Sequence, residues 1–256
     1  MPEEKQEFGL VPVEDRDVLA NVNLPPVPED LRTSDEWFDP ERDLVMPRLK
    51  LLQAMTAEVN PGEKRVDGAV PGLFLNTLTK RIFTPPVAVV MVSTTKSAHF
   101  FAEEPEESCH SLDTITGSLY GACRSCAHNW QVWKKNERGD RVPPNCAETV
   151  NFLLLTEGGS PSIFACMKTA LRTAKDFVAQ RRAMLPSFLR NWWDRPVILN
   201  VAAAKNAKGQ PFFRPTLAFD TKRTTDEISR RLAYECFLST QGKRVRAETE
   251  EDGPSS

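Results

Sequence analysis

The sequence predicts a mainly β, α+β fold in which a helix separates the third and the fourth of five strands. Three observations lead to this expectation. Short runs rich in β-branched and aromatic residues recur from residue 47 to residue 219. An amphipathic helical pattern interrupts them at about residues 167–185. With 256 residues, 40% of them hydrophobic, the chain is also long enough to bury a proper core.

The predicted strands follow one another in the first two thirds of the chain. Residues 47–52 alternate between apolar and polar side chains, and residues 72–78 form an apolar run bounded by glycine and polar residues. Residues 87–92 are continuously apolar and rich in valine, and residues 150–155 and 162–165 are similar. We expect each of these segments to be a strand.

A helix is predicted at about 167–185 because its apolar residues recur on one side. That side carries Met167, Leu171, Ala174, Val178 and Leu185, and an adjacent side carries Lys168, Arg172, Lys175 and Arg182. A basic face of this kind is usual on any solvated surface helix, so it admits a structural interpretation as well as a binding one.

The end of the body is predicted to be a hairpin and a second helix. Residues 197–201 and 212–219 are rich in β-forming residues and flank a glycine-containing polar turn. A capping box at residues 224–227 then starts a helix with Ile228, Leu232 and Cys236 on its apolar face.

This order of elements matches the OB-fold, a partly open barrel whose exposed face commonly binds oligonucleotides. The predicted architecture is therefore an OB-fold-like barrel at residues 46–240, with an insertion at about residues 103–148 and flanking helices. Residues 1–45 are acidic and proline-rich and are expected to form an extended arm, and residues 241–256 an acidic disordered tail.

Charge is distributed unevenly along the chain. Residues 47–246 hold 29 basic and 18 acidic residues, a net charge of +11, between two acidic ends. A basic body favours a polyanionic partner such as nucleic acid, although basic domains of this size are common. No membrane-length apolar run or signal peptide is present, so we expect a cytoplasmic protein without a membrane partner.

The strongest chemical signal is a group of four cysteines. Cys109, Cys123, Cys126 and Cys146 are separated by 13, 2 and 19 residues in a polar, turn-rich segment. Two thiolates two residues apart can bind one metal from a single turn, and two more complete the tetrahedron that structural zinc prefers. We therefore predict one structural Zn²⁺. Because the segment has few apolar residues, the metal would supply its folding free energy, about 10 kcal/mol or more.

Two histidines are alternative ligands to this set. His110 and His128 lie beside the cysteines, and either could replace one of them. Cys166 and Cys236 are placed on the apolar faces of helices and are expected in the core. The segment lacks the histidine–glutamate patterns of catalytic zinc, and the chain has no phosphate-binding loop or nucleophile elbow, so we expect no catalytic residues and no enzyme.

Aromatic residues next to cations are candidates for binding single strands, because unstacked bases favour aromatic platforms beside cations that contact the phosphates. The predicted nucleic-acid-binding residues are Phe100, Phe101, Trp130, Trp133, Lys134, Lys135, Lys168, Arg172, Lys175, Phe212, Phe213 and Arg214. For each phenylalanine, burial is the competing interpretation. The tryptophans are the better candidates because a polar insertion has little core to hold them.

The residue runs 47–53 and 71–77, together with the four-cysteine segment that ends in Pro143-Pro144-Asn145-Cys146, resemble phage-encoded OB-fold, zinc-containing single-stranded DNA-binding proteins. The resemblance covers about residues 45–220. It implies a role in phage DNA replication or recombination in the cytoplasm of an infected bacterium, with partner proteins recruited through the acidic tail. Better-known zinc-bearing members use a histidine ligand, which keeps His110 and His128 open.

Two functions from different classes therefore remain. The first is sequence-tolerant binding of single-stranded DNA in a basic, aromatic-lined groove. The alternative is a zinc-containing adaptor that contacts a host protein of transcription or replication through the insertion. An enzyme acting on nucleic acid would be a third, and it would require metal-dependent turnover.

Overall fold

The computed structural model describes residues 45–102, 104–135, 137–139, 141–142, 144–184, 191–206, 209–240 and 246–247. This part of the chain is mainly β with a few helices, as predicted. The predicted acidic arm, apart from its last residue, lies outside the described residues. So does the predicted tail, apart from Arg246 and Ala247.

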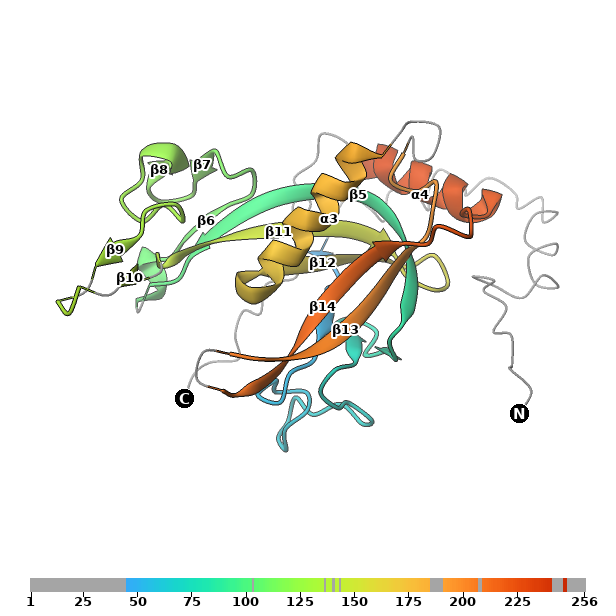
Figure 1. The fold of residues 1–256 in the computed structure, drawn as a ribbon, viewed down its shortest axis with the longest axis horizontal. Coiled ribbons are helices and arrows are strands. Elements are labelled where there is room, and N and C mark those ends of the chain that lie inside the picture. Colours follow the sequence, from blue (N-terminus) through green and yellow to red (C-terminus); the bar gives the residue numbers. More distant parts are fainter. Residues whose placement is uncertain are drawn as a thin grey trace, which may run out of the picture.

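A six-stranded antiparallel sheet forms the centre of the fold. Its order is β12 (Pro161–Met167), β11 (Cys146–Leu155), β5 (Val87–Phe100), β13 (Val197–Lys205) and β14 (Pro211–Phe219), and β6 (Cys109–Ser111) also pairs with β5. The predicted strand at 87–92 is confirmed but continues to Phe100. Its first three residues pair with β13, and the segment from Val90 onward pairs with β11, so β5 joins the two halves of the sheet (Figure 1).

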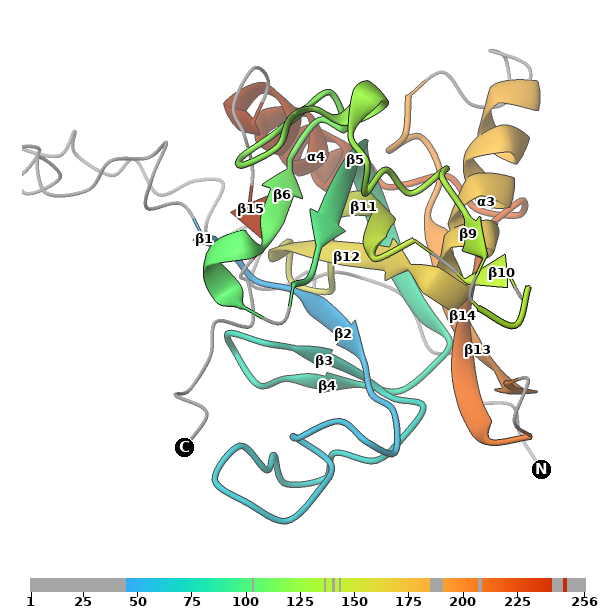
Figure 2. The ribbon, with the colours of Figure 1, turned by 90° about the vertical axis from the view of Figure 1, so that its left-hand side faces the viewer.

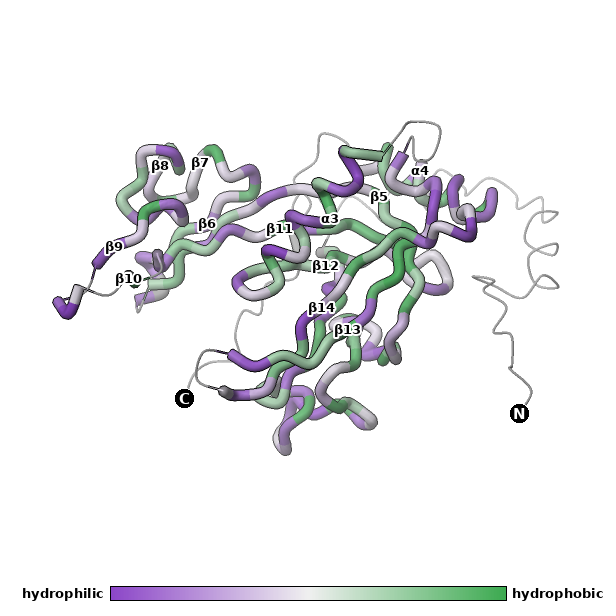
Figure 3. The backbone as a smooth tube through the Cα atoms, viewed as in Figure 1, coloured by the Kyte–Doolittle hydropathy of each residue, from purple (hydrophilic) through white to green (hydrophobic). Residues whose placement is uncertain are grey.

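The inner face of this sheet holds the main core. Every second side chain of a strand points to this face, and these side chains are mostly valine and other apolar residues. The central strands therefore carry much of the hydrophobic colour in Figure 3. Phe177 lies at its centre, with its ring 4.7 Å from that of Phe219 and 5.9 Å from that of Phe152.

A second sheet closes the same core from below. It consists of β2 (Leu49–Leu51), β3 (Phe74–Asn76) and β4 (Ile82–Phe83) (Figure 2). The Phe74 ring packs edge-on against Phe164 of β12 at 5.8 Å. The predicted strands at 47–52 and 72–78 are therefore confirmed, in a sheet separate from the central one.

The sheets do not close into a barrel, so the predicted barrel is wrong in this respect. The outer edges of β12 and β14 bind the chain around β2 instead of each other. The Pro47 carbonyl accepts the Ile163 N–H at 2.8 Å. The Gln53 side chain accepts the Phe213 N–H at 2.9 Å and donates to the Phe213 carbonyl at 2.8 Å. The chain around β2 therefore lies between the two edges and contacts each of them.

The predicted helix after β12 consists of a 3-10 turn, η4 (Lys168–Ala170), and α3 (Leu171–Ala183). It crosses the central sheet (Figure 1) and buries Ala174 and Phe177 against the core. Met167 ends strand β12 instead of starting the helix, and Cys166 is fully buried in that strand. The predicted core position of Cys166 is thus confirmed, on a strand instead of a helix.

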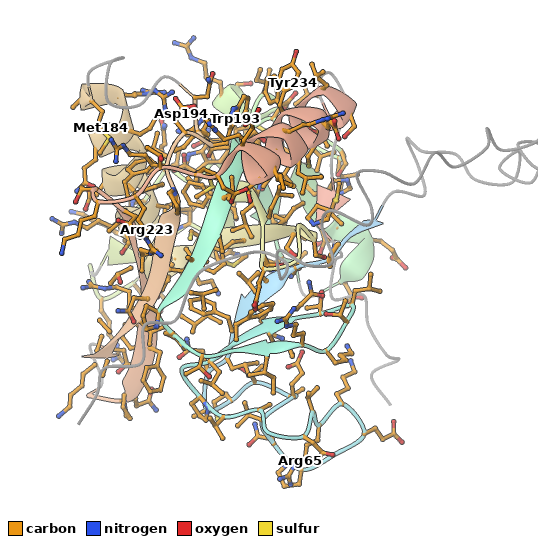
Figure 4. All side chains as sticks on the ribbon, turned by 90° about the vertical axis from the view of Figure 1, so that its right-hand side faces the viewer. Arg65, Met184, Trp193, Asp194, Arg223 and Tyr234 are labelled. Carbon is orange, nitrogen blue, oxygen red and sulfur yellow. The ribbon has the colours of Figure 1, made fainter. Side chains whose placement is uncertain are left out.

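The last helix, α4 (Glu227–Thr240), packs on the outer face of the central sheet, which is the face opposite the main core. The predicted apolar face is wrong: Ile228 and Leu232 are exposed, and Cys236 is only half-buried. The small residues Ser229 and Ala233 are buried instead, on the side of the helix that packs against the large side chains of the sheet. Trp193 packs on this helix against Tyr234 (Figure 4).

Short elements complete the chain. The segment between β5 and β11 holds η2 (Pro105–Glu107), β7 (Thr116–Gly117), β8 (Gly121–Ala122), η3 (Cys123–Ser125), β9 (Lys134–Lys135) and β10 (Arg141–Val142). Near the chain ends, β1 (Val45–Met46) pairs in parallel with β15 (Arg246–Ala247).

Candidate zinc centre and nucleic-acid interface

The cysteine-rich segment lies between β5 and β11, as the sequence predicts. These two long strands extend beyond the core, and the segment with β6–β10 projects from their ends (Figure 1). We call this segment, residues 101–145, the insertion. It makes two small hairpins, β7–β8 and β9–β10, and attaches through β6 to the edge of β5.

All four predicted cysteines line one pocket of about 20 Å³, which has room for an ion and not for an organic ligand. Residues from β5, β6, β7, η3 and the start of β11 surround it, so the topology gathers chain positions that are far apart in sequence. Its lining includes Cys109, Gly117, Cys123, Cys126, His128 and Cys146.

Local backbone structure supports thiolate chemistry in this pocket. The Leu119 N–H donates to Cys109 Sγ and the His128 N–H to Cys126 Sγ, each at 3.4 Å. Burial raises the pKa of Cys109, but the N–H groups of Leu119 and Tyr120 and the Ser118 hydroxyl outweigh it, so the pKa lies below its ordinary value. A Cβ atom on Gly117 would lie only 2.7 Å from Cys109 Sγ, so only glycine fits at this position.

The pKa of Cys146 is affected by the other three cysteines. Burial and then the charges of Cys123, Cys126 and Cys109 raise its pKa to about 11. Four thiolates in one small pocket repel one another unless a cation lies between them. Among the described residues, no three His, Cys, Asp or Glu side chains are already arranged to hold a metal.

The two histidines occupy different surroundings. The His128 ring lies against Phe100 at 4.2 Å and Tyr120 at 5.0 Å. His110 is exposed, with Nδ1 3.2 Å from the Ser118 hydroxyl, and opposes His99 on the neighbouring strand. Both line the pocket, so both remain alternative ligands.

The structure separates the predicted nucleic-acid-binding residues into two groups. In the insertion, Trp133, Lys134 and Lys135 are exposed around β9, and Trp130 is half-buried beside the cysteines. Phe100 is only 6% exposed and packs on Tyr120, whereas Phe101 is 53% exposed. Phe100 therefore offers no free ring face.

The second group lies on the body, away from the insertion (Figure 1). Phe212, Phe213 and Arg214 belong to β14; both rings are half-buried, and Arg214 is exposed. Lys168 and Arg172 lie on η4 and α3, and Arg172 is within 3.9 Å of Asp176.

Lys175, the remaining predicted contact, has an acidic partner that sequence reasoning missed. Glu148 is 8% exposed and binds Lys175 of α3 and, at 3.1 Å, Lys96 of β5. Burial raises the pKa of Glu148, but the two lysines outweigh it and hold the pKa below its ordinary value. His99, which stacks on Phe101, was missed as well. The i, i+2 spacing of these two rings on a strand was the available signal.

Residues 39–235 match the sequence profile of a family described as Pam3 phage gp34-like protein. Comparisons with curated proteins and with solved structures gave no match. No helix among the described residues is long and apolar enough to cross a membrane. Since the family match covers well over half of the sequence, the chain belongs to the Pam3 phage gp34-like protein family.

Proposed function

We propose that this phage protein binds single-stranded DNA without strong sequence preference and acts in phage DNA replication or recombination. The observation that carries the proposal is the strand order of the central sheet. Numbering β5, β11, β12, β13 and β14 from first to fifth, the order is third, second, first, fourth, fifth, with α3 between the third and the fourth. An OB barrel opened between its third and fifth strands has this order.

The placement of the insertion supports the same function. In OB-folds, the face of the second and third strands and the loops after the first and fourth strands bind oligonucleotides. Here the insertion occupies the loop after the first strand, and Phe212–Arg214 follow the loop after the fourth. The net charge of +11 over residues 47–246 adds an attraction for phosphates.

A binding titration tests the proposal. Fluorescence anisotropy with labelled oligo-dT is expected to give tight binding at low salt and a steep loss of affinity as salt rises, because released counterions drive association. Absence of binding at low salt would overturn the proposal. A chain ending before Ala247 is expected to bind more tightly if the acidic tail competes for the same basic surface.

We further propose that Cys109, Cys123, Cys126 and Cys146 bind one structural Zn²⁺. Their shared pocket, the N–H donors to sulfur and the glycine beside Cys109 all suit a thiolate site. Bound zinc would fix the insertion on the ends of β5 and β11 and neutralise the thiolates.

Elemental analysis of the purified protein tests the zinc proposal. One zinc per chain is expected, with loss in Cys123→Ser and retention in the control Cys166→Ser, whose thiol lies in the core. Retention in both His110→Ala and His128→Ala supports the four-cysteine set. Loss of zinc in either variant would mean that this histidine is a ligand in place of one cysteine. A wild-type protein without zinc would refute the site.

One observation favours the second candidate, a zinc-containing adaptor for a host protein. Of the fourteen large hydrophobic side chains that are exposed in the described part of the chain, seven lie in the insertion: Phe101, Ile115, Leu119, Tyr120, Val132, Trp133 and Val142. Such concentration is typical of protein-binding surfaces. Stoichiometric capture of one host protein, unaffected by nuclease, would favour the adaptor.

A further inference from the structure

The outer face of β5, β11 and β12 between α4 and the insertion has an unusual composition. The register places Ser93, Thr95 and Ser97 of β5 on this face, opposite Leu153, Asn151 and Thr149 of β11. Ala165 and Met167 of β12 continue the face. We call this surface the outer strip. Its side chains are mostly small or hydroxylated. Thr149 and Leu153 are buried, and α4, Trp193 and Met46 pack at the far end of the strip.

No carboxylate lies on the outer strip. The three strands contain a single acidic residue, Glu148, and strand alternation turns it to the inner face, where Lys96 and Lys175 bind it. A polyanion on the outer strip would therefore meet no opposing carboxylate from the sheet.

An aromatic stack ends the strip next to the insertion. The rings of His99 and Phe101 lie 4.0 Å apart with planes inclined by only 8°. Residues i and i+2 of an extended chain share a face, so the two rings continue the outer strip. His99 covers one face of the Phe101 ring, and Phe101 is 53% exposed.

This geometry suits base stacking. A ring already held parallel to a neighbour loses little rotational freedom when a base stacks on it, so more of the stacking energy remains as affinity. Small side chains beside it let the nucleotide backbone approach the sheet. Two neighbouring aromatic residues differ: Phe100 of β5 is buried, and Tyr120 packs on Phe100 and His128.

We propose that Phe101, backed by His99, is the platform on which a base of single-stranded nucleic acid stacks, and that the strand continues over the outer strip toward α4. The inference rests on the proposed single-strand binding and names the position of one base within it. A peptide on the same face would need no aromatic plane at Phe101.

Affinity for oligo-dT at fixed low salt, measured for matched variants, tests this inference. Phe101→Leu is expected to weaken binding about 5- to 150-fold, the equivalent of one lost stacked base. Phe101→Trp is expected to retain wild-type affinity or exceed it. Val70→Ala is the control, since Val70 has almost the same exposure at 51% but lies before β3, outside the insertion and the outer strip; its affinity is expected to be unchanged.

The outcomes separate the inference from the proposed function. If the wild type binds oligo-dT and Phe101→Leu binds equally well, the platform is wrong while single-strand binding stands. If the wild type does not bind, the function itself fails. Photocrosslinking of the wild type with an oligonucleotide containing 5-iodo-deoxyuridine provides a second measurement that needs no variant. Adducts at Phe101 or His99 are expected, and adducts confined to β14 would overturn the proposal.

Discussion

Replacing Glu148 by glutamine isolates a buried charge that holds three elements together. Glu148 lies on β11, and its two carboxylate oxygens contact Lys96 of β5 and Lys175 of α3. The glutamine keeps the size and one acceptor oxygen but removes the charge. Both lysines then face a neutral group at a position that is only 8% exposed.

The expected loss of stability is about 2 kcal/mol. A net hydrogen bond to a charged group contributes about 1.5–3 kcal/mol when buried, and an exposed ion pair about 0.2–1 kcal/mol. The lysine side chains here are 56% and 46% exposed, so each contact is worth about 1 kcal/mol, between these limits.

The pH dependence follows from the lowered pKa of Glu148. A carboxylate whose pKa is lower in the folded than in the unfolded chain stabilises above the ordinary value of 4.5, and this stabilisation is lost as the pH falls through the folded value. The difference between wild type and Glu148→Gln in urea unfolding is therefore expected to be constant from pH 7 to about 5.5 and to shrink below pH 4.5.

The matched control is Glu157→Gln. Glu157 also pairs with a cation, Arg81, at 2.6 Å, but both side chains are about half exposed, so a loss below about 0.5 kcal/mol is expected. Equal losses in the two variants, or a Glu148→Gln loss that persists undiminished at pH 3, would refute the reasoning.

Three further variants or measurements probe the fold. Gln53→Ala is expected to lower the free energy of unfolding by about 1–3 kcal/mol, because it leaves the edge N–H and carbonyl of Phe213 unpaired; a loss no larger than that of the exposed Gln210→Ala would contradict this. Phe177→Ala is expected to cost about 3–5 kcal/mol in urea unfolding through the cavity it leaves between β11 and β14, and a loss under about 1 kcal/mol would contradict the central packing. Burial raises the pKa of Cys166 to about 12, so mass spectrometry is expected to find no alkylation of Cys166 by iodoacetamide at pH 8 until the chain unfolds; alkylation at the unfolded rate would contradict its burial.

Local pattern was enough to place most elements. The strands at 87–92, 150–155 and 162–165 and the hairpin at 197–219 are confirmed, because β-branched runs between turn residues have few alternatives. The inward face of α4 was wrong for a physical reason. Burying a large apolar residue such as Ile228 would gain more transfer free energy, but α4 packs its small residues Ser229 and Ala233 against the large side chains of the sheet.

The sequence by itself determined the elements, the insertion and the cysteine set, because these depend on residue type and spacing along the chain. Only the tertiary structure decided that the barrel stays open. The Gln53 side chain binds the edge of β14 at Phe213, which is 160 residues away in the sequence, where a neighbouring strand would otherwise pair. The tertiary structure also decided that Phe100 is buried while Phe101 is exposed, and that Glu148 binds two lysines. These outcomes depend on strand register and on contacts between distant segments, which the spacing of residues along one chain does not specify.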